Sequence, residues 1–397
     1  MRKSNGIAAV LAATAASTLV LTATPAMAEP APGTTVSATN IVGVGSDTTQ
    51  DVLNALTADL APLDGVVSFD ATGPSPITVG GISFTRPNSG NGITALSRSV
   101  DAGLWVGTVT CPAPPGGTIT GLLDFARSWR GPKARGDLGP SAPLTFIPMA
   151  RDALTYAYNG AGLSNLTLPQ LRNIYSANTA AQAKTAAGGV DVTPLLPTCS
   201  DTRDPFLDAI GLTETTLGDY VKPTPQANKA DGIVDSPGEI VPFSTAQWIA
   251  QRNHVTTSHV DLAYALGTRL GTPLKDLLGD PLAATKSVTT NGVTKLVPDP
   301  DYYANATFGR DVYNVVETAR ITTGNAKYDS ALAAVFAGPS SKITSADSDA
   351  IIANYGFQVV SYAGDTDIPG TACNPANNGD IGGTTGSGDH AKGGALE

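Results

Sequence analysis

The chain has 397 residues, with 34 acidic against 24 basic side chains and a formal net charge of −10. An acidic chain with few aromatic residues is poorly suited to bind nucleic acid or an anionic membrane, so neither is an expected partner. No run of about 18 apolar residues follows the N-terminal region, and no membrane-spanning helix is predicted.

Residues 1–28 have the pattern of a secretory signal peptide. Arg2 and Lys3 precede an apolar stretch at 7–21, and Ala26-Met27-Ala28 provides an A-x-A cleavage site. No cysteine stands at that site, so a lipid anchor is not predicted. We expect an exported mature protein that begins after Ala28 and is either secreted or held at the cell surface.

Predicted strands and helices alternate along the mature chain. Apolar runs predict strands at Ile41–Val44, Leu144–Pro148, Thr193–Leu196, Ile240–Phe243, Val312–Val316 and Phe357–Val360. Helical spacing predicts helices over Asp51–Leu60 and Ala246–Gln251, a further helix that follows the capping box at Thr167–Gln170, and a last helix from Ser345 to about Gly356. The alternation indicates α/β layers around a largely parallel sheet. The segment 374–397, rich in Gly, Asn and Thr, is expected to be a disordered tail.

A short loop of small and hydroxyl-bearing residues recurs four times after an apolar run. The four loops lie at 43–49, 87–92, 125–130 and 197–203. Small residues allow the backbone to approach a ligand, and the first N–H groups of a helix have no partner within it. Ser and Thr are also ordinary helix caps, so one such loop means little. Four in one chain predict that the loops converge on a small anion.

The three cysteines, Cys111, Cys199 and Cys373, are an odd number for an exported chain. Their spacing fits no zinc pattern, and one disulfide plus one thiol is the simplest arrangement. Because Cys199 lies inside the fourth loop, we favour a Cys111–Cys373 bridge.

Over about residues 40–362 the sequence resembles the substrate-binding proteins of phosphate ABC transporters, which have the two-lobed type II periplasmic binding protein fold. No single motif carries this resemblance. It consists of segments in the same order, which are Gly45–Thr48, Asn88–Gly92, Phe125–Ser128, Pro148–Ala153, Leu166–Ser176, Ser200–Arg203 and Tyr355–Phe357. The run Leu166–Ser176 is the most specific of them, and its role is structural.

The resemblance implies two α/β lobes that close over a ligand by a hinge motion. Lobe one would comprise 38–148 and 316–373, and lobe two 149–315 with the hinge strands. Both Cys111 and Cys373 would then belong to lobe one. The implied ligand is phosphate or a related oxyanion, handed to an ABC transporter permease by a monomeric protein without a cofactor. The ligand-binding set comprises Ser46, Asp47, Thr48, Ser89, Gly90, Arg127, Ser128, Ser200, Asp201, Thr202 and Arg203.

Three positions depart from the family pattern. The family carries an Asp directly after the Ser of the third loop and an Arg four residues before the Ser of the fourth, where this chain has Trp129 and Leu196. In the fourth loop, Asp201 adds a carboxyl group. Positive charge would then come from Arg127, Arg130 or Arg203, and Asp47 or Asp201 would accept the ligand's proton.

Other functions stay open at this point. A hydrolase is disfavoured, because the only histidines are His254, His259 and His390 and there is no G-x-S-x-G elbow. The same loops would suit another oxyanion or a small organic acid. The altered loops also allow a binding fold recruited as a surface, cell-wall or sensing protein. Arg151-Asp152 is expected to form a structural ion pair at the hinge.

Overall fold

The computed structural model describes residues 29–30, 33, 35–59, 65–106, 117–131, 143–366, 369–370, 373–374 and 379–380. The predicted signal peptide and most of the predicted tail therefore lie outside the described residues. The predicted Cys111–Cys373 bridge also lies outside them, since Cys111 is not described and Cys373 is described only as part of a strand.

One mixed sheet runs through the molecule in the order β2-β1-β5-β15-β6-β9-β7-β8. The strands are β1 Ile41–Gly45, β2 Val66–Ser68, β5 Phe125–Ser128, β6 Leu144–Tyr158, β7 Thr193–Pro197, β8 Lys222–Thr224, β9 Glu239–Ser244 and β15 Gly309–Glu317. The neighbours of β1 and of β7 are parallel to them, whereas β15 and β6 run antiparallel to their neighbours. The sheet is thus parallel towards both ends and antiparallel in the middle.

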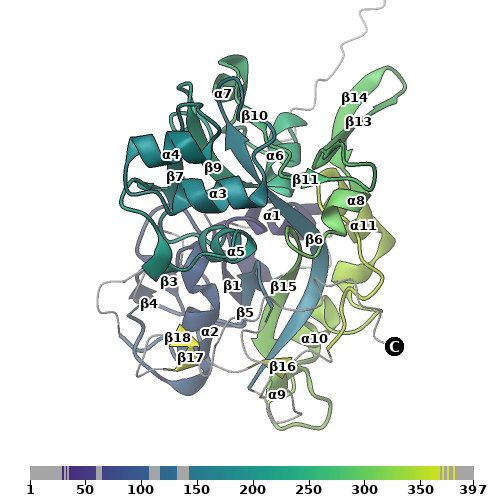
Figure 1. The fold of residues 1–397 in the computed structure, drawn as a ribbon. Coiled ribbons are helices and arrows are strands. Elements are labelled where there is room, and N and C mark those ends of the chain that lie inside the picture. Colours follow the sequence, from purple (N-terminus) through teal and green to yellow (C-terminus); the bar gives the residue numbers. More distant parts are fainter. Residues whose placement is uncertain are drawn as a thin grey trace, which may run out of the picture.

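The long strand β6 joins the two halves of the molecule. Its first part, Leu144–Ala153, pairs with β15, and its second part, Leu154–Tyr158, pairs with β9. Figure 1 shows β6 running from the half that contains β1, β5 and α2 to the half that contains β7, β9, α3 and α4. The predicted strand at Leu144–Pro148 is therefore the start of a longer element. The lobe boundaries expected from the sequence stay a prediction.

Helices cover both halves of the sheet. In chain order they are α1 Gln50–Asp59, α2 Gly92–Asp101, α3 Leu168–Tyr175, α4 Ala180–Ala186, α5 Arg203–Ala209, α6 Thr245–Arg252, α7 Asp261–Ala265, α8 Pro300–Tyr303, α9 Thr318–Ile321, α10 Ser330–Phe336 and α11 Ala346–Asn354. The predicted capping box is confirmed, because the Thr167 side chain caps α3 and Gln170 reaches back to the Thr167 N–H. Ser345 caps α11 as expected, and Gly356 beyond its end has a φ of 83°.

The remaining strands are short or lie at the surface. They are β3 Ile77–Val79, β4 Ile82–Phe84, β10 Arg269–Leu270, β11 Leu274–Lys275, β12 Pro281–Leu282, β13 Thr285–Thr290, β14 Val293–Pro298, β16 Pro369–Gly370, β17 Cys373–Asn374 and β18 Gly379–Asp380. The predicted strand at Phe357–Val360 is wrong. Only Gln358 pairs, in an isolated bridge with Arg151, because the chain turns away into the turn at 361–364.

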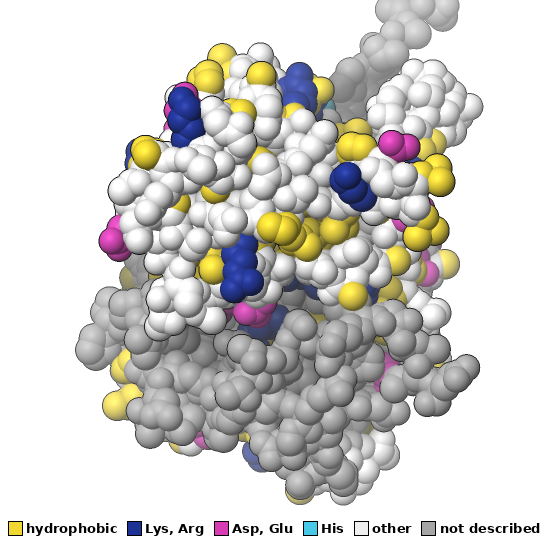
Figure 2. All heavy atoms as spheres, viewed as in Figure 1, with side chains coloured by type: hydrophobic (Ala, Val, Ile, Leu, Met, Phe, Trp, Pro, Cys, Tyr) yellow, Lys and Arg dark blue, Asp and Glu magenta, His cyan; other side chains and the backbone are white. Residues whose placement is uncertain are grey.

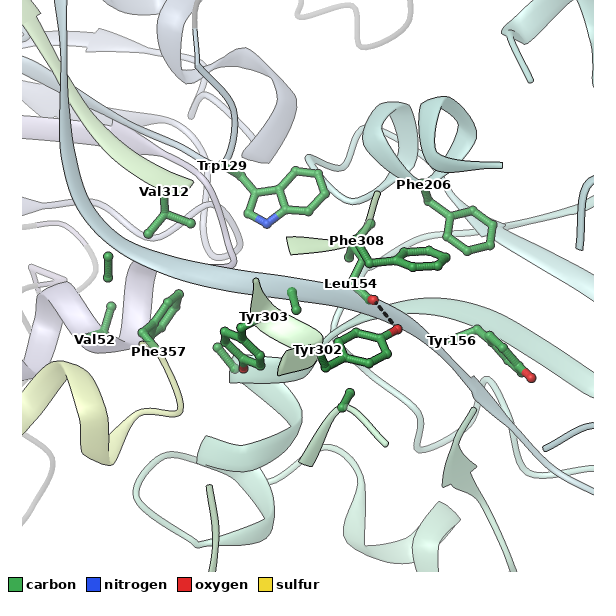
Figure 3. Packing of buried hydrophobic residues seen from close by; sticks show 14 of the residues in the cluster. Val52, Trp129, Leu154, Tyr156, Phe206, Tyr302, Tyr303, Phe308, Val312 and Phe357 are labelled. Carbon is green, nitrogen blue, oxygen red and sulfur yellow. Dashed lines mark hydrogen bonds between the residues drawn. The ribbon is translucent and has the colours of Figure 1, made fainter. Parts of the chain in front are cut away.

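A hydrophobic core extends across the junction of the halves. The largest cluster of buried side chains includes Val52 on α1, Trp129 after β5, and Tyr175 on α3. Figure 3 shows Trp129, Phe206 and Phe308 along one edge of β6 and Tyr302 and Tyr303 along the other. Because this core is continuous, the two halves are packed against each other in this structure.

Candidate functional site

The first and third loops are held together because β1 and β5 are adjacent parallel strands. Gly45 stands opposite Arg127 in the register, and the Ser46 N–H donates to the Arg127 carbonyl at 3.2 Å. Gly92, the first residue of α2, packs so closely here that a Cβ on it would lie 2.6 Å from the Gly45 Cα. Two glycines therefore permit the close contact that brings α2 and the second loop against the first.

The hydroxyl of Ser89 connects three of the four predicted loops. It donates to Asp47 Oδ1 at 2.6 Å and accepts the Asp47 N–H at 3.0 Å. The Asp201 N–H, from the fourth loop, also donates to it at 3.4 Å. Residues that lie far apart in the sequence thus meet at one buried oxygen atom between the two halves.

The second half adds contacts that the sequence did not reveal. The Asn228 side-chain amide donates to both Asp47 Oδ2 and Thr48 Oγ1 at 3.4 Å. Gln247, on α6, donates to the Thr48 carbonyl at 2.8 Å. Asn228 has a φ of 54°, which Asn tolerates better than most residues, and no motif marks it. Gln247 and Gln251 stand one turn apart on a helix and could have suggested a polar face.

The two carboxyl groups at this junction have raised pKa values. Burial is the main cause that raises the pKa of Asp201 to about 8, and the nearby Asp47 carboxyl adds to the rise. A hydrogen bond from Ser46 opposes it. Burial also raises the pKa of Asp47, against the hydrogen bond from Ser89. Asp201 is therefore mostly protonated at pH 7, and the junction carries less negative charge than its two carboxyls imply.

Arg127 is fully buried and binds to the protein's own backbone. Its guanidinium donates to the carbonyls of Ser46 at 3.1 Å, Gly45 at 2.8 Å and Phe69 at 2.9 Å, and to the hydroxyl of Ser68. This arginine fixes the start of the first loop. Its side chain is not exposed to solvent.

The remaining predicted residues serve their own loops or the surface. The Ser128 hydroxyl donates to the Arg130 carbonyl at 2.7 Å, and Ser200 and Thr202 share a hydrogen bond of 2.7 Å. Arg203 points away from the junction and binds Glu214 through Nη2 at 2.7 Å. Gly90 belongs to the short 3-10 turn Ser89–Asn91.

The contacts of Arg151 and Asp152 differ from the hinge ion pair that we expected between them. Arg151 Nη1 binds Asp311 at 2.9 Å. Asp152 instead accepts from the Ser244 hydroxyl at 2.7 Å, the Ala246 N–H at 2.9 Å and the Trp129 indole at 3.3 Å. Consecutive residues of an extended strand point to opposite faces, which separates these two side chains.

Charged side chains are spread over the described surface in this view. Figure 2 shows Lys or Arg and Asp or Glu side chains scattered among uncharged ones on the described part of this face. Within the described ranges there is no group of His, Cys, Asp and Glu that could hold a metal ion. No helix in that part of the chain is long and apolar enough to cross a membrane.

Comparisons with known proteins give structural likenesses only. No protein-family model and no curated protein matches the sequence. Among solved structures, a Clostridium perfringens protein assigned as a phosphate ABC transporter substrate-binding protein, with bound phosphate, is 16% identical, with a TM-score of 0.48 over 82% of this chain and 100% of the other. An ABC-type phosphate transport receptor from Vibrio cholerae is 16% identical, with a TM-score of 0.47 over 81% of this chain and 100% of the other.

These neighbours belong to the class that the sequence resembles. Their TM-scores lie below 0.5, so the case for a function rests on the geometry of this chain.

Proposed function

We propose that this protein binds a small oxyanion between its two halves, with phosphate as the leading ligand. The observation that carries the proposal is the convergence at Ser89, whose hydroxyl contacts Asp47 from the first loop and the Asp201 N–H from the fourth. Hydroxyl and N–H donors from both halves are what a dehydrated anion needs to replace water. An anion bound there would hold the halves together.

The carboxyl groups suit a ligand that carries a proton. A phosphate with one or two protons can donate to an ionised Asp47, and a protonated Asp201 can donate to a phosphate oxygen. The raised pKa of Asp201 supports such a donation near neutral pH. A fully ionised pair would repel the anion instead.

The proposed biological role is capture for uptake. The predicted signal peptide places the mature chain outside the cytoplasm, and the resemblance implies delivery to an ABC transporter permease. The site contains donors and acceptors for binding, and the proposal includes no catalytic step.

The test is a calorimetric titration with phosphate of the mature chain, stripped of ligand by unfolding and refolding. Ser46→Ala and Ser89→Ala should each weaken binding by about tenfold, the equivalent of one hydrogen bond. Ser287→Ala is the matched control, since Ser287 lies exposed on β13. Micromolar or tighter binding that both site variants weaken supports the proposal. Equal affinity in all three variants would remove the assignment of the site.

A second function is favoured by one observation. The Ser89 hydroxyl already donates to the chain's own Asp47 carboxyl, as an oxyanion-binding hydroxyl would donate to a ligand. A junction filled by its own carboxyls would suit a fold recruited as a surface or sensing protein without a small ligand. If phosphate produces no binding heat and no thermal stabilisation of the protein, this alternative is favoured.

A further inference from the structure

A buried arginine outside the predicted set retains unused donors. Arg310 follows Gly309 at the start of β15 and stands opposite Asp152 on β6. Only 9% of it is exposed. Its Nη2 makes one long hydrogen bond, to the Phe308 carbonyl at 3.4 Å, and its Nε is buried without a partner. A guanidinium has five N–H donors, and leaving them unused in a protein interior is costly.

The position of Arg310 is fixed without a partner carboxylate. Its guanidinium lies 3.6 Å from the centre of the Trp129 ring, a cation–π contact. The nearest facing carboxyl, Asp152, already accepts from Ser244, Ala246 and Trp129. No ion pair of Arg310 occurs within the described residues. The arginine is therefore held by its flat face, and its edge remains available.

The Nη1 end of that edge is not fully buried. Among described residues Nη1 has no hydrogen-bond partner. It is also not one of the fully buried atoms that lack a partner, so it contributes to the small exposed area of Arg310. Trp129 follows Ser128 at the end of β5, two residues beyond the position that pairs with Gly45. Arg310 therefore lies beside Trp129 in the third loop.

Three other arginines of this region bind protein groups. Arg127 binds three backbone carbonyls, Arg151 binds Asp311, and Arg203 binds Glu214. Burial lowers the pKa of Arg310 to about 9, although the nearby Asp152 and Asp208 carboxyls oppose the shift, so the side chain is still charged at pH 7. An oxyanion would both satisfy its donors and restore its charge balance.

We propose that Arg310 supplies the positive charge that holds the captured oxyanion, through the guanidinium edge that carries Nη1. The inference rests on the proposed function and deepens it, because it assigns the charge to a hinge strand instead of a loop. The chemical class of the ligand is a phosphate or another small oxyanion with two oxygens able to face a planar guanidinium.

The test compares Arg310→Gln and Arg310→Lys with the parent by calorimetric titration with inorganic phosphate and, separately, sulfate. Both variants should bind at least about tenfold more weakly, since Gln lacks the charge and Lys lacks the planar pair of donors. Arg269→Gln is the matched control, because Arg269 is exposed and also stacks on an aromatic ring, that of Tyr264.

A stability measurement separates binding from a structural role. Without ligand, Arg310→Gln should unfold at an equal or higher urea concentration, because it removes a buried charge with unused donors. A purely structural arginine would lower that midpoint. Unchanged phosphate affinity in either folded variant overturns the inference and leaves the proposed function standing. If the Arg310 variants bind phosphate more weakly while Ser46→Ala and Ser89→Ala keep full affinity, the loop site alone is overturned. A parent protein that binds neither phosphate nor sulfate overturns both the inference and the proposed function.

Discussion

We expect the carboxyl of Asp201 to control the binding of an anion at the junction. With its pKa raised to about 8, it is neutral at pH 6 and 7 and ionises as the pH passes 8. At pH 9 its neutral fraction falls to about one tenth, so binding of an anion beside it should weaken by about that factor. Phosphate itself also titrates between pH 6 and 9. The dissociation constant of the parent is therefore compared with that of Asp201→Asn at the same pH, where phosphate has the same charge for both proteins. The ratio of the two dissociation constants, measured from pH 6 to 9, should rise about tenfold. A constant ratio would show that Asp201 does not face the ligand.

The same group predicts how stability depends on pH. A carboxyl whose folded-state pKa is raised contributes stability that is fully present below its ordinary pKa and is lost as the pH rises through the folded-state value. Wild-type protein should thus lose free energy of unfolding between about pH 4 and pH 8. Asp201→Asn should show a shallower loss, because Asn does not titrate. Urea unfolding at several pH values measures this, and parallel curves for the two proteins would contradict it.

At the scale of elements, the position of α2 depends on two glycines. A Cβ on Gly92 would lie 2.6 Å from the Gly45 Cα and 3.2 Å from the Arg127 carbonyl oxygen, both backbone atoms that cannot rotate away. Gly92→Ala should cost roughly 1–3 kcal/mol of unfolding free energy and weaken phosphate binding, since it moves Ser89 away from Asp47. Gly117→Ala is the control, because a Cβ there meets nothing within 4 Å. Equal stability of the two variants would show that the packing relaxes without cost.

Local patterns predicted the elements well and the site only in part. The capping box at Thr167 and the apolar run of β1 depend on neighbouring residues, so the sequence is sufficient to place them. The strand expected at Phe357–Val360 failed because pairing depends on a distant edge, which only Gln358 reaches. Asn228 and Arg310 were missed for the same reason. The contacts of these two residues are with residues far away in the sequence, and local spacing does not indicate such contacts.

At the scale of the whole molecule, polar contacts join the two halves in addition to the shared apolar core. The amide of Gln247 on α6 reaches the Thr48 carbonyl, and the Asp201 N–H reaches Ser89. We expect such contacts to influence the balance between closed and open forms.

Gln247→Ala should therefore favour the open form although it removes no proposed ligand contact. Ligand-free protein should show a larger radius of gyration by small-angle X-ray scattering, and saturating phosphate should restore the parent value. The affinity should fall by the factor by which the closed population falls, about threefold to tenfold for loss of the hydrogen bond to Thr48. Gln247 also accepts from Gln251, which lies on the same helix. Gln226→Ala, with an exposed side chain, is the control. Weaker binding with an unchanged radius of gyration would mean that Gln247 contacts the ligand and that the hinge is not involved.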